Sequence, residues 1–239
     1  MERFSRTEKL LGSGKLKKLS SSSVLLVGAG AVGSYAAEGL ARSGVGKITV
    51  VDFDTVNITN INRQLYALES TIGKPKVELA AARLTDINPA CEIKALNLFA
   101  DAQSIPALLA EKPDLIVDAI DSVASKVELL ARAVEAGIPV VSSMGAARRT
   151  NPLAVQVGSI FKTTGCPLAR QIRKSLRQRG VRDGITAVFS TETVDSSSHS
   201  RLHNEDGSTE KVLGSLPTVT GIFGLVAADT AVKFLLESC

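Results

Sequence analysis

The sequence predicts an α/β fold: a doubly wound, Rossmann-like and mostly parallel sheet with helices on both faces. Short apolar segments with strand character alternate with helical segments along most of the chain. The segment VLLVGAGAVGS joins an apolar strand to a helix through closely spaced glycines. The composition, 44% hydrophobic and 22% charged over 239 residues, is ordinary for a globular protein.

The elements follow one another in a regular order. Apolar runs bounded by turn residues predict strands at 24–27, 47–51, 92–96, 115–119, 140–142, 153–157 and 185–190. Helical spacing with glycine and proline stops predicts helices at 3–19, 35–43, 73–88, 125–136, 168–177 and 218–236. The serine-rich segment 195–209 is predicted to be a mobile loop. We expect one domain over 1–239, with a nucleotide-binding part at 1–160 and a substrate part at 161–239.

Composition excludes several classes of protein. The three cysteines, Cys91, Cys166 and Cys239, form no C-x-x-C pair, so neither a structural zinc site nor a disulfide framework is indicated. The N-terminus lacks the apolar core of a secretory signal. Asp229 and Lys233 interrupt the longest apolar run, which we interpret as a buried helix and not as a membrane span. We expect a cytoplasmic protein.

The glycines after the first strand predict a phosphate-binding turn. Gly28, Gly30 and Gly33 have the G-x-G-x-x-G spacing. The first glycine permits a tight turn, the second lets backbone approach a phosphate, and the third lets the helix pack close to the strand. The helix N-terminus adds free N–H groups and a positive dipole end. This stretch therefore predicts a bound nucleotide without saying which one.

Polar residues after the second strand favour a triphosphate. Asp52 ends that strand, where an acidic residue takes ribose hydroxyls in dinucleotide folds, so an NAD-dependent oxidoreductase is compatible up to this point. Asn60, Arg63 and Gln64 then form a tight cluster, and Lys76 opens the next helix. Two cations and two amides suit a triphosphate that loses pyrophosphate. Hydride transfer does not need such a group of side chains.

Aspartates after the fourth strand predict a magnesium site. Asp118 and Asp121 lie at the carboxyl end of that strand, where they could place a magnesium ion on the phosphates. His199 and His203 have the spacing of a helical metal pair, but they lie in a polar segment without a hydrophobic frame, so we expect no metal there.

Positive charge is concentrated in the second half of the chain. Residues 162–182 contain seven basic residues and no acidic one, although the net charge of the chain is only +4. Leu168, Ile172 and Leu176 mark the buried stripe of a helix whose other face is basic. Phosphate contacts dominate nucleic-acid affinity, so this tract predicts a nucleic-acid surface. Its predicted contact residues are Arg148, Arg149, Arg170, Arg173, Lys174 and Arg177.

Four ordered motifs carry a family resemblance. GAGAVGS, DFDTVNITNINRQ, GKPK and DAIDS resemble the ATP-binding adenylation domain of ubiquitin-activating-type enzymes. The resemblance implies bound ATP and magnesium, with Asp121 serving the metal and Asp52 the ribose. The implied nucleotide-binding residues are Gly28, Gly30, Gly33, Asp52, Asp54, Asn60, Arg63, Gln64, Lys76 and Asp121.

The same resemblance implies catalysis, assembly and a mixed sheet. Arg63, Lys76 and Asp121 would act on ATP together with Arg6, in RFSRT, which reaches the neighbouring subunit's ATP in a homodimer. Antiparallel strands added by a C-terminal extension would complete the sheet.

Further stretches indicate one branch of that group. RFSRTEKLLG, GIPVVSSMGAARRTNPLAVQV, CPLARQIRKSLRQRG and VFSTE resemble the tRNA threonylcarbamoyladenosine dehydratases. This resemblance implies ATP-dependent activation of the threonine carboxylate, ring closure by the neighbouring carbamoyl group and loss of one water. Intramolecular attack needs no covalent cysteine, and Cys166 is the one candidate for a thioester. The alternatives are an enzyme that adenylates the C-terminus of a ubiquitin-like or sulfur-carrier protein, with a sulfur-transfer partner, and a noncatalytic binding module.

Overall fold

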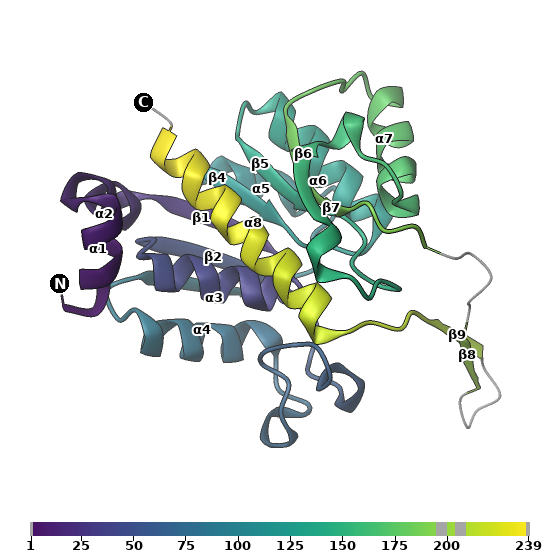
Figure 1. Cartoon of the computed structure of the whole chain (residues 1–239), viewed down its shortest axis with the longest axis horizontal. Coiled ribbons are helices and arrows are strands. Elements are labelled where there is room, and N and C mark those ends of the chain that lie inside the picture. Colours follow the sequence, from purple (N-terminus) through teal and green to yellow (C-terminus); the bar gives the residue numbers. More distant parts are fainter. Residues whose placement is uncertain (1, 195–199, 204–208, 238–239) are drawn as a thin grey trace.

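The computed structural model describes residues 2–194, 200–203 and 209–237. A seven-stranded sheet runs through the molecule in the order β3-β2-β1-β4-β5-β7-β6 (Figure 1). The strands are β1 (Ser23–Val27), β2 (Lys47–Asp52), β3 (Glu92–Asn97), β4 (Leu115–Asp118), β5 (Val140–Ser143), β6 (Val155–Ser159) and β7 (Ile185–Ser190). Only β6 in this sheet pairs antiparallel, with β7. The predicted mostly parallel sheet with an antiparallel addition is confirmed.

Helices cover both faces of the sheet. They are α1 (Ser5–Leu11), α2 (Ser13–Ser21), α3 (Gly33–Ser43), α4 (Lys76–Ile87), α5 (Ile105–Ala110), α6 (Val123–Glu135), α7 (Pro167–Gln178) and α8 (Pro217–Glu237). Val24 and Leu26 of β1 join the core beneath α3, α4 and α8, whereas Leu25 and Val27 join the core beneath α5, α6 and α7. Because both faces of β1 are buried, its sequence is continuously apolar.

The closing helix α8 lies against α3 across one face of the sheet (Figure 1). A Cβ at Gly39 of α3 would stand 2.7 Å from the Cβ of Ala228 in α8, so the two helices pack closely. Within the described part of the chain, α8 is the one helix long and apolar enough to cross a membrane. Its Phe223, Ala227 and Ala231 are fully buried, as in the core helix of a globular domain.

Several predicted boundaries differ from the structure. The helix predicted at 3–19 is broken at Gly12, whose φ of +88° ends α1 before α2 begins. The helix predicted from 73 begins at Lys76, because Pro75 precedes its first turn. The sixth strand begins at Val155 and not at 153, since residues 152–154 form a 3₁₀ turn capped by the side chain of Asn151.

The predicted loop 195–209 contains regular structure. Strands β8 (Ser200–His203) and β9 (Thr209–Val212) form an antiparallel pair, so the prediction of a loop is wrong for these residues. The loop prediction was based on polar composition, which does not exclude a two-stranded ribbon. His199 lies outside the described residues.

The strand order reverses between β1 and β4. In open α/β sheets, ligands bind at such a reversal, outside the carboxyl ends of the strands. Residues 28–33 follow β1, Asp52 ends β2, residues 119–122 follow β4 and residues 144–151 follow β5. The topology therefore brings the predicted nucleotide site together at one edge of the sheet, which we call the carboxyl edge.

Candidate nucleotide site and basic surface

The glycine loop is held by close backbone contacts. Gly28 has a φ of +97°, and a Cβ there would stand 2.6 Å from the Ala119 carbonyl oxygen. A Cβ at Gly33 would stand 1.7 Å from the carbonyl oxygen of Gly28. Gly30 differs, because the one atom that its Cβ would meet is Gln64 Nε2, at 3.7 Å. Gly28 and Gly33 are therefore required by the fold, whereas Gly30 leaves open space of the kind a phosphate needs.

This difference gives a testable prediction. Gly30→Ala should fold with the stability of the parent and bind ATP at least about tenfold more weakly, because the new methyl fills space meant for the ligand. Gly33→Ala should fail to fold, since its Cβ would overlap the Gly28 carbonyl. Thermal unfolding and calorimetric ATP titration of the two variants check the prediction. Parental ATP affinity in Gly30→Ala would contradict it.

Two aspartates connect β2 to the glycine loop and to α4. Asp52 accepts hydrogen bonds from the backbone N–H of Ala29, at 2.6 Å, and of Asp54, at 2.8 Å. Lys76 Nζ lies 2.7 Å from Asp54 Oδ2, and the exposed fraction of the lysine side chain is only 6%. The sheet edge thus orients Asp52 and places the Lys76 ammonium before any ligand is bound.

The predicted amide and arginine cluster lies on one turn. The Asn60 side chain accepts from the Asn57 N–H at 3.1 Å, which closes a capping box. Arg63 donates to the Thr59 carbonyl at 2.7 Å. Gln64 faces the glycine loop at Gly30. Asn60 and Arg63 are therefore engaged by their own turn, and of this cluster only Gln64 approaches the glycine loop directly.

Asp118 and Asp121, both predicted near magnesium, have different surroundings. Asp118 is fully buried and accepts from Lys126 Nζ at 2.6 Å and from the Ser142 hydroxyl at 2.5 Å. Asp121 is exposed, and no hydrogen bond or ion pair to its carboxylate is found among residues 2–194, 200–203 and 209–237. This corrects the prediction for Asp118, whose oxygens are already used. Sequence reasoning missed Lys126 and Ser142.

The free carboxylate of Asp121 fits a magnesium ion that also touches phosphates. Magnesium commonly takes one or two carboxylates and completes its shell with water and phosphate oxygens. No group of three or more metal-ligating side chains occurs in the described part of the chain, so a metal held by protein alone is not indicated there. The donor set suits a metal that arrives with the nucleotide.

Arg6 is not part of this chain's own site. Arg6 is exposed on α1, and α2 connects α1 to the start of β1. In Figure 1, α1 and α2 lie by the start of β1, away from the glycine loop that follows the strand's last residue. A role of Arg6 at a nucleotide therefore requires a second subunit, as the resemblance implies.

Cys166 forms the N-cap of α7. Its Sγ accepts from the Ala169 N–H at 3.4 Å, and the residue is 6% exposed. We expect Cys166→Ser to keep full activity, because a serine hydroxyl can cap the helix in the same way and the ring closure that the resemblance implies needs no thioester. Steady-state turnover of the folded variant measures this. Loss of most activity would instead indicate a covalent role.

The basic helix α7 presents three exposed cations. Arg170, Lys174 and Arg177 are exposed, and the Arg177 guanidinium lies 5.7 Å from the ring centre of Phe161. Arg173 is half-buried and donates to Thr163 Oγ1 and to the Ile160 carbonyl. Burial lowers the pKa of the Arg173 guanidinium. The guanidinium of Arg173 thus anchors α7 to the preceding turn, and its phosphate contact stays a prediction.

Arg148 and Arg149 are neighbours with opposite surroundings. Arg149 is 2% exposed and donates to the carbonyls of Gly145, Gly165 and Glu192, so the predicted phosphate contact is corrected for this residue. Arg148 is half-buried with a left-handed φ of +62°, and its buried Nε and Nη2 atoms find no hydrogen-bond partner in the described part of the chain. Arg148 therefore remains a candidate for an anionic substrate group.

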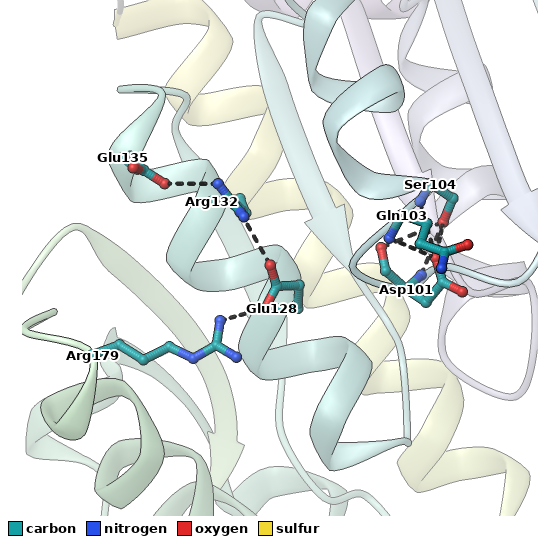
Figure 2. A network of polar contacts seen from close by, with 7 residues as sticks. All are labelled: Asp101, Gln103, Ser104, Glu128, Arg132, Glu135 and Arg179. Carbon is teal, nitrogen blue, oxygen red and sulfur yellow. Dashed lines mark hydrogen bonds and ion pairs between the residues drawn. The ribbon is translucent and has the colours of Figure 1, made fainter.

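A separate open pocket, about 660 Å³ in volume, lies between α6 and the segment 179–184. Charged and apolar side chains both line it. Figure 2 shows Glu128 between Arg132 and Arg179, with Arg132 also meeting Glu135. Hydrogen bonds from Arg179 and Arg132 lower the pKa of Glu128. The second cluster in the figure is a turn in which Asp101 accepts from the N–H groups of Gln103 and Ser104. Arg179 is exposed, but its guanidinium is paired with Glu128, so we do not count it among the cations that are available to phosphates.

The carboxyl edge combines the glycine loop with Asp52, Lys76 and the exposed Asp121. This combination on a Rossmann-like fold is typical of a nucleotide-binding protein whose site takes phosphates. The chain belongs to the ThiF family, which matches residues 4–238. The tRNA threonylcarbamoyladenosine dehydratase of Bacillus subtilis is 45% identical over 193 residues, which cover 81% of this chain and 76% of the relative. The Escherichia coli protein of the same name is 34% identical, covering 98% and 94%.

Solved structures agree with these relatives. The E. coli tRNA N6-threonylcarbamoyladenosine dehydratase in complex with ATP superposes with a TM-score of 0.89 at 34% identity, covering 98% of this chain and 93% of that one. The same enzyme in complex with AMP gives a TM-score of 0.88. This E. coli relative has therefore been solved with ATP and with AMP.

Proposed function

We propose that this protein is an ATP-dependent tRNA threonylcarbamoyladenosine dehydratase. The observation that carries the proposal is a phosphate site whose exposed carboxylate, Asp121, has no partner among the described residues, on a chain that matches such dehydratases over nearly its whole length. The threonine carboxylate attacks the α-phosphorus of ATP and releases pyrophosphate. The neighbouring carbamoyl group then attacks the acyl-adenylate, AMP leaves, and the nucleoside has lost one water.

The residues of the carboxyl edge take complementary parts in this reaction. Lys76, whose ammonium is preplaced by Asp54, and Arg63 hold the charge that develops on the leaving pyrophosphate. Arg63 uses only Nη1 in its bond to the Thr59 carbonyl, so its other N–H groups remain for the phosphates. Asp52 receives the ribose, and Asn60 and Gln64 orient the phosphates. Magnesium held by Asp121 would neutralise phosphate charge during the displacement.

The tRNA contacts the basic surface, which we define as Arg170, Lys174 and Arg177, all exposed along α7. Arg148 follows β5 at the carboxyl edge, where its buried nitrogens, unpaired among the described residues, are candidates for an anionic group of the substrate. Arg6 of a second subunit completes the site in a homodimer. A tRNA substrate is consistent with the cytoplasmic location that we propose.

The alternative, adenylation of a carrier protein, has weaker support. The molybdopterin-synthase adenylyltransferase of E. coli is 44% identical over 131 residues, which cover only 55% of this chain. The dehydratase relative from the same organism matches 98%. The basic helix α7 provides a surface suited to a polyanion, which a carrier-protein C-terminus does not require. A carrier-protein or sulfur-transfer partner therefore stays a secondary proposal.

Mass spectrometry of the modified nucleoside tests the proposal. We would incubate the full chain with ATP, magnesium and tRNA carrying threonylcarbamoyladenosine, then digest the tRNA. The expected product lacks one water, appears only with ATP and is accompanied by AMP and pyrophosphate. Unchanged nucleoside, with adenylation of a small carrier protein under the same conditions, would contradict the dehydratase proposal.

A further inference from the structure

Three polar side chains are fully buried behind the carboxyl edge. Asp118 ends β4, Lys126 lies in α6, Ser142 lies in β5, and each is 0% exposed. Asp118 Oδ2 accepts from Lys126 Nζ at 2.6 Å and from Ser142 Oγ at 2.5 Å. Asp118 Oδ1 accepts from the Ile120 N–H at 3.0 Å. We call these three residues the buried cluster.

Stability alone does not explain the buried cluster. Removing two charges from water costs several kcal/mol per ion, and apolar residues of similar volume often serve a core as well or better. β4 and β5 are already joined by backbone pairing at Asp118 and Ser142. Lys126 adds something that the strand pairing does not supply, namely a link from the end of β4 to the first turns of α6.

That link closes the loop 119–122 at both ends. Asp118 precedes the loop and bonds to Ile120 within it, while Lys126 belongs to the helix that follows. Ala119 of the loop donates to the Val27 carbonyl at 2.8 Å, and its own carbonyl is the atom that excludes a Cβ at Gly28. Asp121 lies exposed in the same loop. The buried cluster therefore braces the backbone that carries both Asp121 and the Ala119 carbonyl beneath the glycine loop.

We propose that Lys126 and Ser142 are positioning residues that hold Asp121 in place for the metal–nucleotide complex. This inference rests on the proposed function, in which Asp121 binds magnesium. Saturation of Asp118 by three donors also keeps its carboxylate from competing for the metal. Removing a direct partner of a metal ligand typically changes metal affinity by about 10–100-fold. Lys126 and Ser142 contact Asp118 and act on Asp121 through the loop backbone, so we expect an effect at the lower end of this range.

The experiment compares neighbouring serines of β5. Ser142→Ala removes the hydroxyl bonded to Asp118, whereas Ser143→Ala removes a buried hydroxyl bonded to the Met144 carbonyl instead. A double variant, Asp118→Asn with Lys126→Met, removes the link to α6 without leaving a lone buried charge. The measurements are amide hydrogen exchange of the ligand-free protein and calorimetric ATP affinity across magnesium concentrations.

We expect Ser142→Ala to speed exchange in residues 119–122 and to raise the magnesium concentration for half-maximal ATP binding, each by about tenfold. The double variant should show larger changes, and Ser143→Ala should match the parent. Parental exchange and magnesium dependence in folded Ser142→Ala would overturn the proposal, even if the double variant does not fold. Asp121→Ala separates the two hypotheses. If this variant keeps the parental magnesium dependence, the metal role of Asp121 is wrong. Hydrogen exchange of residues 119–122 in Ser142→Ala then tests the positioning role by itself.

Discussion

Asp121→Ala is expected to lower turnover by about 10²–10³-fold while the protein keeps its fold. The carboxylate is exposed and unpartnered within residues 2–194, 200–203 and 209–237, so its loss removes no internal contact there. Surface substitutions of this kind change stability by about 0.5 kcal/mol or less. The large effect on turnover follows because magnesium on the phosphates would lose its protein ligand when pyrophosphate leaves.

The measurement is single-turnover conversion of modified tRNA at several magnesium concentrations, with thermal unfolding as the check on folding. Asp183→Ala is a matched control, because Asp183 is also exposed but precedes the first residue of β7, at the opposite edge of the sheet. The control should convert substrate at the parental rate. A folded Asp121→Ala that also does so at every magnesium concentration would show that the metal assignment is wrong.

The first half of the fold could be predicted because its signals are local. The apolar run of β1, the three glycines and the start of α3 are adjacent in the sequence, and each has a direct steric cause. The carboxyl-edge position of Asp52 and Asp121 then follows from the parallel topology. The break at Gly12 was missed because a lysine-rich segment with periodic leucines reads as one continuous helix.

The contacts that sequence reasoning missed share one cause. Asp118 and Asp121 look equivalent in the sequence, but Lys126 and Ser142 saturate only Asp118, through contacts 8 and 24 residues apart. Arg149 and Arg148 are adjacent, yet only Arg149 meets carbonyls at residues 165 and 192. Arg173 lies among exposed cations of α7 but reaches Thr163. Charge patterns indicate where cations lie, and tertiary contacts decide which of them remain available.

The basic surface provides the second large effect. Changing Arg170 and Lys174 together to Ala should weaken tRNA binding on the order of thirtyfold at 0.1 M salt, because each lost phosphate contact removes roughly 0.7–0.9 from the log–log salt slope. The slope should therefore fall by about 1.4–1.8 in total. Both residues are exposed on α7, so folding and ATP affinity should stay unchanged.

The measurement is tRNA affinity by filter binding or fluorescence anisotropy at several salt concentrations. Lys15→Ala with Lys17→Ala serves as the control, since these exposed lysines of α2 give the same loss of charge on a different element. Arg173→Ala is unsuitable because its bonds to Thr163 and Ile160 would be lost along with the charge. An unchanged affinity and salt slope in the α7 variant would mean that this face is only solvated, and would favour a carrier protein as the substrate.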